Sequence, residues 1–344
     1  MAHLADVTRE VRIALKLLTA SLIIVVFLFI FFKGGLIMKN LFFPTPPLPP
    51  EEKFGKLPRV SFPAQKIENI NYRINTLSGD LPNFPDRINV YKVKKKNPSI
   101  IALQTVRENL KSQGFSENEV KINDSLYQWT SNNQVVIQYN IFNDYFKINS
   151  NFLVNPSSPP EGAGAKKDRT FNASIDFLQG LGLETSDFAE NESDIAYLKI
   201  TNGTLTVAEN QNDAQFVRVD LFQKNIDKDY KIYYPTAKNS TTYFIFKNDS
   251  SPSKIVAGKY QHLLPDDSST YPIITAELAF EELKKGNVLV FNDIQGKDTI
   301  DITDISLGYY AGEENQQYFL PIIVFKGNAF KAYVQAISET SIGN

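Results

Sequence analysis

The most apolar part of the chain is IALKLLTASLIIVVFLFIFF, from Ile13 to Phe32, with Lys16 as its one charge. A helix of this length matches a bilayer core of roughly 30 Å. A soluble helix normally shows a polar face, but residues 22–32 are entirely apolar. We therefore predict an uncleaved transmembrane helix near residues 13–38, within an anchor over 1–40. A buried core helix and a cleaved signal peptide are the alternatives, and large phenylalanines disfavour a cleavage site.

The charges beside this run indicate its orientation. Arg9, Arg12 and Lys16 precede the apolar core, whereas Lys33 and Lys39 follow it. This excess favours a cytoplasmic N-terminus. The predicted location is therefore the plasma membrane, single-pass, with the bulk of the chain extracytoplasmic.

Composition divides the remainder of the chain. FFPTPPLPPEEKFGKLP is proline-rich and predicts an extended linker over 41–62. NPSSPPEGAGAKKDR, residues 155–169, indicates a flexible joint. We predict a first α+β module over 63–158 and a second α+β region over 159–344, whose C-terminal unit is 256–344.

Helical periodicity recurs three times after the linker. The segments IIALQTVRENLKSQGF, TFNASIDFLQGLG and ITAELAFEELKKGN each carry an apolar stripe and end at glycine. In the third, Thr275 is the expected N-terminal cap, and the predicted helix is 275–285.

Alternating strand patterns follow each helix. They include QVVIQYNIF, QFVRVDLF, YFLPIIVF and FKAYVQAI, and Asn202-Gly203 predicts a hairpin turn. The C-terminal sheet should contain strands at 302–310, 318–325 and 330–337. The fold class predicted from this order is α+β: a transmembrane helix, a proline-rich linker, then repeated helix-plus-antiparallel-sheet modules.

Composition removes several chemistries. The 344 residues include no cysteine and two histidines, so thiolate sites are excluded. The net charge is −2, so the chain lacks the overall positive charge typical of nucleic-acid-binding proteins. His262 is the one histidine outside the N-terminal tail, and no G-x-S-x-G motif accompanies it; we interpret it as a loop residue. Asp298, Asp301 and Asp304 recur every three residues in a strand-like segment. We predict no catalytic, metal or cofactor-binding residues and no cofactor, although a carboxylate pair from distant parts of the chain stays open.

The C-terminal order of elements resembles the YycI-like, PepSY-related extracytoplasmic regulators. The matching residues are Thr275, Ala276 and Ala279 on the helix, Leu307-Gly308-Tyr309-Tyr310 on a strand, and then Pro321, Tyr333 and Ala336. The resemblance extends over about residues 100–337 and is strongest over 273–337. Ile322 and the Gln335-Ala336-Ile337-Ser338 ending depart from the family pattern. The resemblance implies PepSY-like modules and a non-enzymatic role in restraining a membrane sensor or binding another protein.

Leu307, Gly308, Tyr309, Tyr310 and Pro321 form the predicted structural or binding signature. Glycine within a strand suggests a bulge or the close approach of another element, and proline belongs on an edge strand or at a bulge. Neighbouring tyrosines point to opposite faces, so one can lie in the core and the other at the surface.

We expect a non-catalytic, membrane-anchored binding or regulatory protein of the bacterial cell envelope. Its expected partners are the membrane and another membrane or envelope protein, with no nucleic acid. An envelope enzyme of the glycan hydrolase type and a structural envelope scaffold are the alternatives.

Overall fold

The structure is a computed structural model in which the chain divides into two compact units, residues 1–49 and 50–344. It describes residues 15, 17–19, 21–22, 24–27, 29, 31, 33, 49–63, 70–95, 100–154, 158–160, 164–227, 229–250, 254–286, 288–292, 299–312 and 316–343.

The predicted transmembrane helix requires correction. The described positions between Leu15 and Lys33 are helical, and their large apolar side chains, such as Leu17 and Phe31, are exposed. Within the described part of the chain, however, no helix is both long enough and apolar enough to cross a membrane. The prediction rested on the continuous run of letters from 13 to 38, several of which lie outside the described residues. The predicted single-pass transmembrane helix is therefore wrong for the described residues, whereas the predicted location of the protein stays a prediction.

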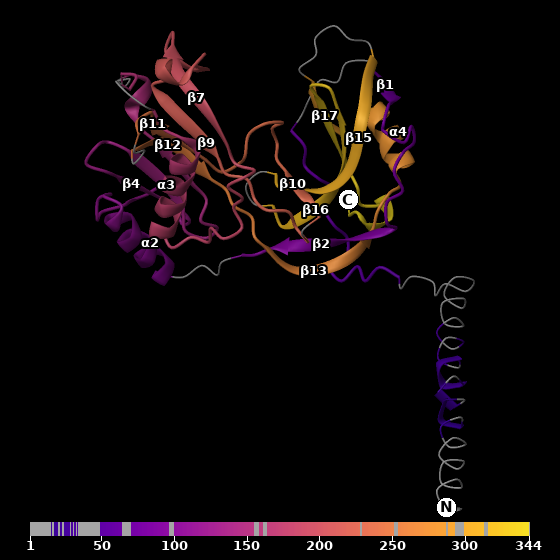
Figure 1. Cartoon of the computed structure of the whole chain (residues 1–344). Coiled ribbons are helices and arrows are strands. Elements are labelled where there is room, and N and C mark those ends of the chain that lie inside the picture. Colours follow the sequence, from indigo (N-terminus) through magenta and orange to yellow (C-terminus); the bar gives the residue numbers. More distant parts are fainter. Residues whose placement is uncertain are drawn as a thin grey trace, which may run out of the picture. The chain divides into compact units, whose positions relative to one another are not determined.

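Two large β-sheets make up the second unit (Figure 1). Among the described residues, eight strands form one sheet: β1 (Asn71–Ile74), β2 (Arg87–Val93), β10 (Lys231–Tyr233), β13 (Pro265–Pro272), β14 (Val288–Asn292), β15 (Thr299–Tyr310), β16 (Tyr318–Gly327) and β17 (Phe330–Gln335). The described strands of the other sheet number nine: β3 (Val120–Lys121), β4 (Leu126–Thr130), β5 (Val136–Asn140), β6 (Phe146–Asn149), β7 (Asp194–Thr201), β8 (Thr204–Val207), β9 (Phe216–Asp220), β11 (Tyr243–Lys247) and β12 (Ile255–Tyr260).

In the part of the chain that the structure describes, two helices cover one face of the nine-stranded sheet. They are α2 (Ile100–Ser112) and α3 (Lys167–Gly180), and both contribute to the same apolar core. The Phe177 ring on α3 packs edge-on against Phe146 and Phe244, which come from β6 and β11. Both helices end as predicted, since Gly114 and Gly182 have left-handed φ angles of 84° and 72°.

One helix, α4 (Ala276–Lys285), packs on the eight-stranded sheet through contacts with β17. Thr275 caps its N-terminus, because its hydroxyl accepts a hydrogen bond from the Leu278 N–H, and Gly286 ends it with a φ of 87°. The predicted helix at 275–285 and the strands at 302–310, 318–325 and 330–337 are confirmed. The Asn202-Gly203 turn is also confirmed, between β7 and β8.

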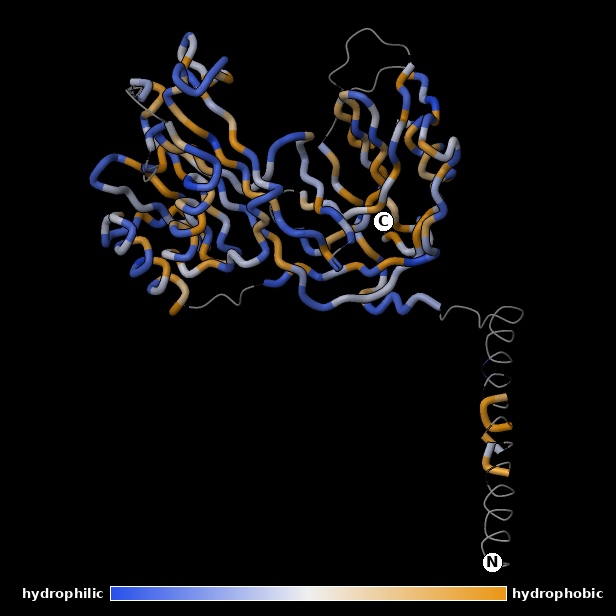
Figure 2. The backbone as a smooth tube through the Cα atoms, in the orientation of Figure 1, coloured by the Kyte–Doolittle hydropathy of each residue, from blue (hydrophilic) through white to orange (hydrophobic). Residues whose placement is uncertain are grey.

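A stretch of extended chain lies on the other face of the eight-stranded sheet. We call residues 51–63 the N-terminal strap. The Val60 N–H donates to the Gln335 side-chain oxygen at 2.7 Å, and Phe62 packs edge-on against Tyr310 at 5.2 Å. Residues 51–62 belong to the predicted linker. Figure 2 shows apolar stretches along the strands of both sheets, with polar stretches in the connections.

The predicted repeat of helix-plus-sheet, PepSY-like modules is wrong. The chain contributes β1 and β2 to the eight-stranded sheet and then builds β3 to β9 of the nine-stranded sheet. It returns to the first sheet with β10, adds β11 and β12 to the second, and completes the first with β13 to β17. β1 pairs in parallel with β15, and their Arg73 and Asp301 side chains form an ion pair. Helix and strand periods are local, so they carry no information about which distant strand becomes the partner. The predicted domain boundaries stay a prediction.

Candidate functional site

The predicted signature lies in the interior of the eight-stranded sheet. Leu307 to Tyr310 belong to β15, and Tyr309 and Tyr310 are only 0% and 2% exposed. They point to opposite faces, but each face has its own apolar core, so neither tyrosine is at the surface. The Tyr309 hydroxyl donates to the Asn89 carbonyl at 2.7 Å. The expectation of one surface tyrosine is therefore wrong, because the sheet is covered on both sides.

Pro321 lies within an interior strand rather than on an edge strand. It pairs with Tyr309 on β15, and its carbonyl accepts a hydrogen bond from the Ala336 N–H at 3.1 Å. The pairing of β16 with β17 runs only from Ile322 to Gly327. In a strand, the N–H and C=O of one residue face the same neighbouring strand. An N–H at position 321 would therefore face the β17 side, just beyond the last paired residue, Ile322. This local end of the pairing is why an interior strand tolerates proline.

Gly308 allows another strand to approach closely, as predicted. A Cβ atom added at this position would lie 2.5 Å from the Tyr233 ring and 2.7 Å from the Lys231 carbonyl oxygen. Both residues belong to β10, which pairs in parallel with β15. The absence of a side chain at 308 thus lets the Tyr233 ring lie over the sheet.

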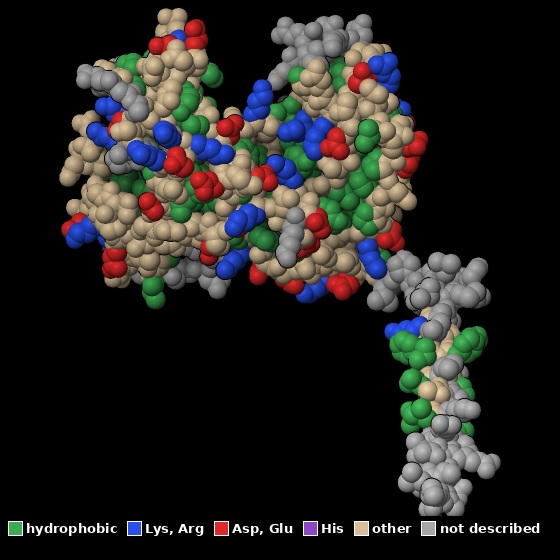
Figure 3. Space-filling model, viewed as in Figure 1, with side chains coloured by type: hydrophobic (Ala, Val, Ile, Leu, Met, Phe, Trp, Pro, Cys, Tyr) green, Lys and Arg blue, Asp and Glu red, His purple; other side chains and the backbone are tan. Residues whose placement is uncertain are grey.

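Three lysines come together around Tyr233. Lys326 on β16 and Lys331 on β17 are direct cross-strand partners. Their ammonium nitrogens lie 6.0 and 5.8 Å from the centroid of the Tyr233 ring. Lys231 lies on β10 opposite Gly308. We call Lys231, Lys326 and Lys331 the lysine cluster, and Figure 3 shows basic side chains gathered over the region where Figure 1 places β10.

Carboxylates neutralise two of the three lysines. Lys326 pairs with Asp304 at 2.7 Å, and Lys231 pairs with Glu192. The Lys331 ammonium donates instead to the Ala237 carbonyl at 3.0 Å, and it forms no ion pair with any described carboxylate. Asp304, Lys326, Lys331 and Phe291 form one register row across β15, β16, β17 and β14.

Burial and like charge act together on Lys331. Desolvation is the larger cause that lowers its pKa, and the positive charges of Lys326 and Lys231 lower it further. For Lys326, burial also disfavours the charged form, but the hydrogen bond to Asp304 and the contributions of Tyr233 outweigh it, so its pKa is raised. Lys331 is therefore the least compensated cation of the cluster.

Aromatic rings form the floor beneath these ammonium groups. The Tyr333 ring lies 5.3 Å from Tyr233 and 5.2 Å from Phe291, measured between centroids. Burial raises the pKa of Tyr333 well above its ordinary value, so its hydroxyl stays neutral. The floor is uncharged, and the positive charge of the site comes from the lysines.

The lysine cluster was not among the predicted site residues. The hairpin between β16 and β17 turns over Asn328 and Ala329, and this register places Lys326 opposite Lys331. The segment FKGNAFKAY contains both lysines, and two strands joined by its two-residue turn would place them opposite each other. This part of the cluster could have been predicted from the sequence. In the sequence, Asp304 belongs to a series of aspartates spaced by three, and no local pattern connects Lys231 and Tyr233 with this hairpin.

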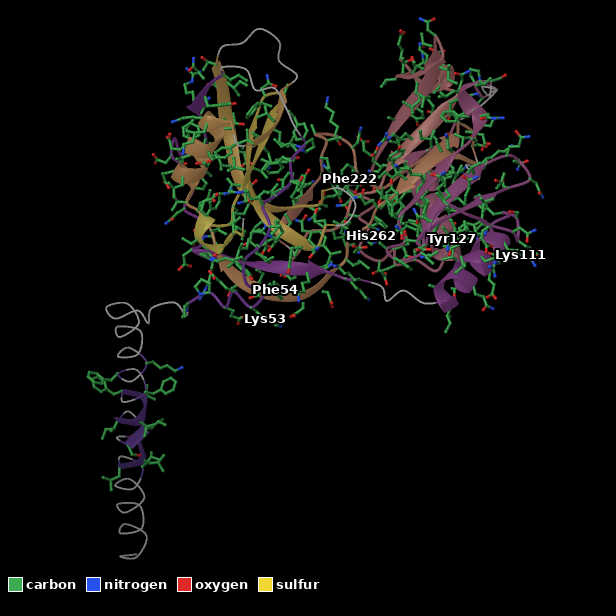
Figure 4. All side chains as sticks on the ribbon, turned by 180° about the vertical axis from the view of Figure 1, so that it is seen from behind. Lys53, Phe54, Lys111, Tyr127, Phe222 and His262 are labelled. Carbon is green, nitrogen blue, oxygen red and sulfur yellow. The ribbon has the colours of Figure 1, made fainter. Side chains whose placement is uncertain are left out.

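The predicted loop histidine lies in a loop, but it is buried. The His262 side chain is 1% exposed; its Nε2 lies 2.8 Å from Asp187 Oδ2 and its Nδ1 lies 3.0 Å from the Tyr260 hydroxyl. Figure 4 shows His262 and Phe222 between the two sheets. Because Asp187 and Tyr260 contact both ring nitrogens of His262, we interpret this histidine as a structural residue.

Two further observations concern cofactors and relatives. The described residues contain no group of three or more His, Cys, Asp or Glu side chains placed to hold a metal ion. No protein-family model and no curated protein matches the chain. One similar solved structure is an uncharacterized protein from Eubacterium rectale ATCC 33656, with 14% identity and a TM-score of 0.39, covering 79% of this chain and 90% of that chain. The resemblance to YycI-like regulators therefore stays a prediction.

Proposed function

We propose that this protein is a non-catalytic binding protein that recognises an anionic group at the lysine cluster. The observation that carries the proposal is the Lys331 ammonium group, which lies beside Tyr233 and two further lysines without a carboxylate partner among the described residues. Like charges directly opposite on neighbouring strands destabilise a sheet. Lys326 and Lys331 form such a pair, and the pKa of Lys331 is lowered by burial and by its lysine neighbours. A bound anion would relieve this repulsion.

The chemistry of the site favours a compact anionic group. Lysine ammonium groups act as flexible point charges, unlike the planar fork of arginine, so they suit a phosphate, sulfate or carboxylate approached from several directions. Half-burial strengthens each interaction, because the local dielectric is lower than in water. The proposal of a non-catalytic role rests on the groups present: ammonium groups and aromatic rings, with Asp304 and Glu192 already paired to lysines.

Isothermal titration calorimetry of the full chain with tripolyphosphate and with sulfate tests the proposal. Lys331→Gln should weaken tripolyphosphate binding at least tenfold, because it removes the least compensated cation. Lys285→Gln is the matched control, since it makes the same charge change in the exposed last turn of α4. Equal loss in both variants would show only a general charge effect and would refute the site, as would an absence of binding to the parent protein.

Salt dependence provides a second measurement of the same site. Affinity should fall as ionic strength rises, because exposed and half-buried charges are screened. The slope should be smaller for Lys331→Gln than for the parent protein. An unchanged slope would contradict the assignment of Lys331 to the anion site.

A further inference from the structure

A second polar site lies on the nine-stranded sheet, on the face opposite α2 and α3. Trp129, Ile137 and Phe146 point to the helix-covered core. Their strand neighbours point the other way and are in register across the sheet: Gln128 with Gln138, Gln138 with Lys147, Lys147 with Lys259, and Lys259 with Tyr243. This row therefore spans β4, β5, β6, β12 and β11.

A groove of about 510 Å³ opens over two members of this row, Gln138 and Lys147. We call it the amide groove, and its lining includes Thr130, Gln134, Gln138, Lys147, Asn149 and Asn151. Its volume falls in the range of about 300–1,000 Å³ that is usual for small-molecule sites. None of the described residues that line it carries a carboxylate.

The lining chemistry suits a ligand rich in hydroxyl groups. Each amide side chain offers both a donor and an acceptor, as each sugar hydroxyl does. The Gln138 amide is held in place by a hydrogen bond from its Nε2 to the Gln128 side-chain oxygen at 3.1 Å. Because Gln138 and Asn149 stand on the paired strands β5 and β6, the sheet positions their amides before any ligand arrives.

Gln134 adds a conformational observation. It lies in the turn between β4 and β5 with a φ of 59°, which is the left-handed region. A non-glycine residue there costs about 1–2 kcal/mol. Glycine would fit this turn better, yet the chain places an amide side chain at the rim of the groove.

Lys147 contributes a positive charge to the lining of the groove, and Lys259 stands beside it on β12, outside the lining. The ammonium groups of Lys147 and Lys259 lie 5.4 and 5.6 Å from the centroid of the Tyr145 ring. The two lysines are direct cross-strand partners. We propose that the amide groove binds an acidic oligosaccharide, whose hydroxyls meet the amides and whose anionic substituent meets Lys147. This proposal does not depend on the lysine cluster.

A glycan array tests the proposal that the amide groove binds an acidic oligosaccharide. The array carries uronate and sulfated tetrasaccharides beside their carboxyl-reduced or desulfated counterparts. The full chain should bind at least one acidic member more tightly than its neutral counterpart. Gln138→Ala and Gln134→Gly should each lower that affinity at least fivefold, and the glycine variant should keep its fold because φ at 134 favours it. Lys147→Gln should remove the preference for the acidic form.

Lys331→Gln is the control that separates the two sites, because it should leave glycan binding intact while it weakens tripolyphosphate binding. Absence of binding to every member of the array overturns the proposal. So does equal binding of acidic and neutral forms, or binding that none of the groove substitutions changes.

Discussion

Gly308→Ala is the sharpest test of how the signature strand supports the lysine cluster. The added methyl group would lie 2.5 Å from the Tyr233 ring and 2.7 Å from the Lys231 carbonyl oxygen. The ring could shift, but the carbonyl belongs to β10, which is hydrogen-bonded to β15. The backbone contact therefore forces the two strands apart.

The expected loss follows from two opposing effects. Overpacking of a well-packed interior costs about 1–3 kcal/mol, and a backbone clash belongs at the upper end of that range. Alanine in a strand recovers about 0.5–1 kcal/mol relative to glycine. The net expectation is a loss of about 2 kcal/mol in the free energy of unfolding.

Urea denaturation followed by circular dichroism measures this loss. Gly343→Ala is the control, since its added methyl would meet Lys56 Cβ at 3.3 Å and nothing closer. The control should lose less than about 0.5 kcal/mol, as surface substitutions usually do. Tripolyphosphate affinity should fall in Gly308→Ala, because Tyr233 supports the lysine cluster. A loss below about 0.5 kcal/mol for Gly308→Ala would refute the close-approach argument.

Four further predictions concern titration and local conformation. Because the pKa of Lys331 is lowered, tripolyphosphate affinity should decrease as pH rises through that lowered pKa; a Lys331→Gln protein that shows the same decrease would contradict this. The pKa of Asp187 is lowered, since hydrogen bonds and charge from His262 outweigh the opposing effect of burial. The stabilising contribution of Asp187 should be complete above its unfolded pKa of about 3.9 and should be lost as pH falls through its lowered folded pKa. The urea midpoint of Asp187→Asn should therefore depend less on pH, between about 5 and about 2, than that of the parent protein. The same pH dependence in both proteins would refute the role of Asp187. Ala329 has a φ of 51°, so Ala329→Gly should raise the unfolding free energy by about 0.5 kcal/mol, and a decrease in the urea midpoint would contradict the strain argument. Thr275→Ala should cost about 1 kcal/mol by removing the cap of α4, whereas Thr275→Ser should retain most of it, and equal losses would disprove the capping role.

Local chemistry in the sequence was sufficient to identify many elements. α4 was predictable because a capping threonine, an apolar stripe and a terminating glycine all lie within one short segment. The turn at Asn202-Gly203 was predictable because asparagine and glycine both tolerate the positive φ that a two-residue hairpin turn requires. The observed φ angles are 52° and 74°. Strand alternation likewise located β15, β16 and β17, since side chains alternate between faces with a period of two.

Only the tertiary structure decided which distant segments meet. The burial of both Tyr309 and Tyr310 depends on separate apolar cores over the two faces of the sheet. The lysine cluster depends on the register that aligns Lys326 with Lys331 and on β10 arriving beside Gly308. Strand pairing uses backbone hydrogen bonds that are common to all residues, so a sequence pattern specifies a strand far better than its partner. Asp304 illustrates the limit: its sequence neighbourhood suggested a carboxylate series, whereas cross-strand pairing placed it against Lys326.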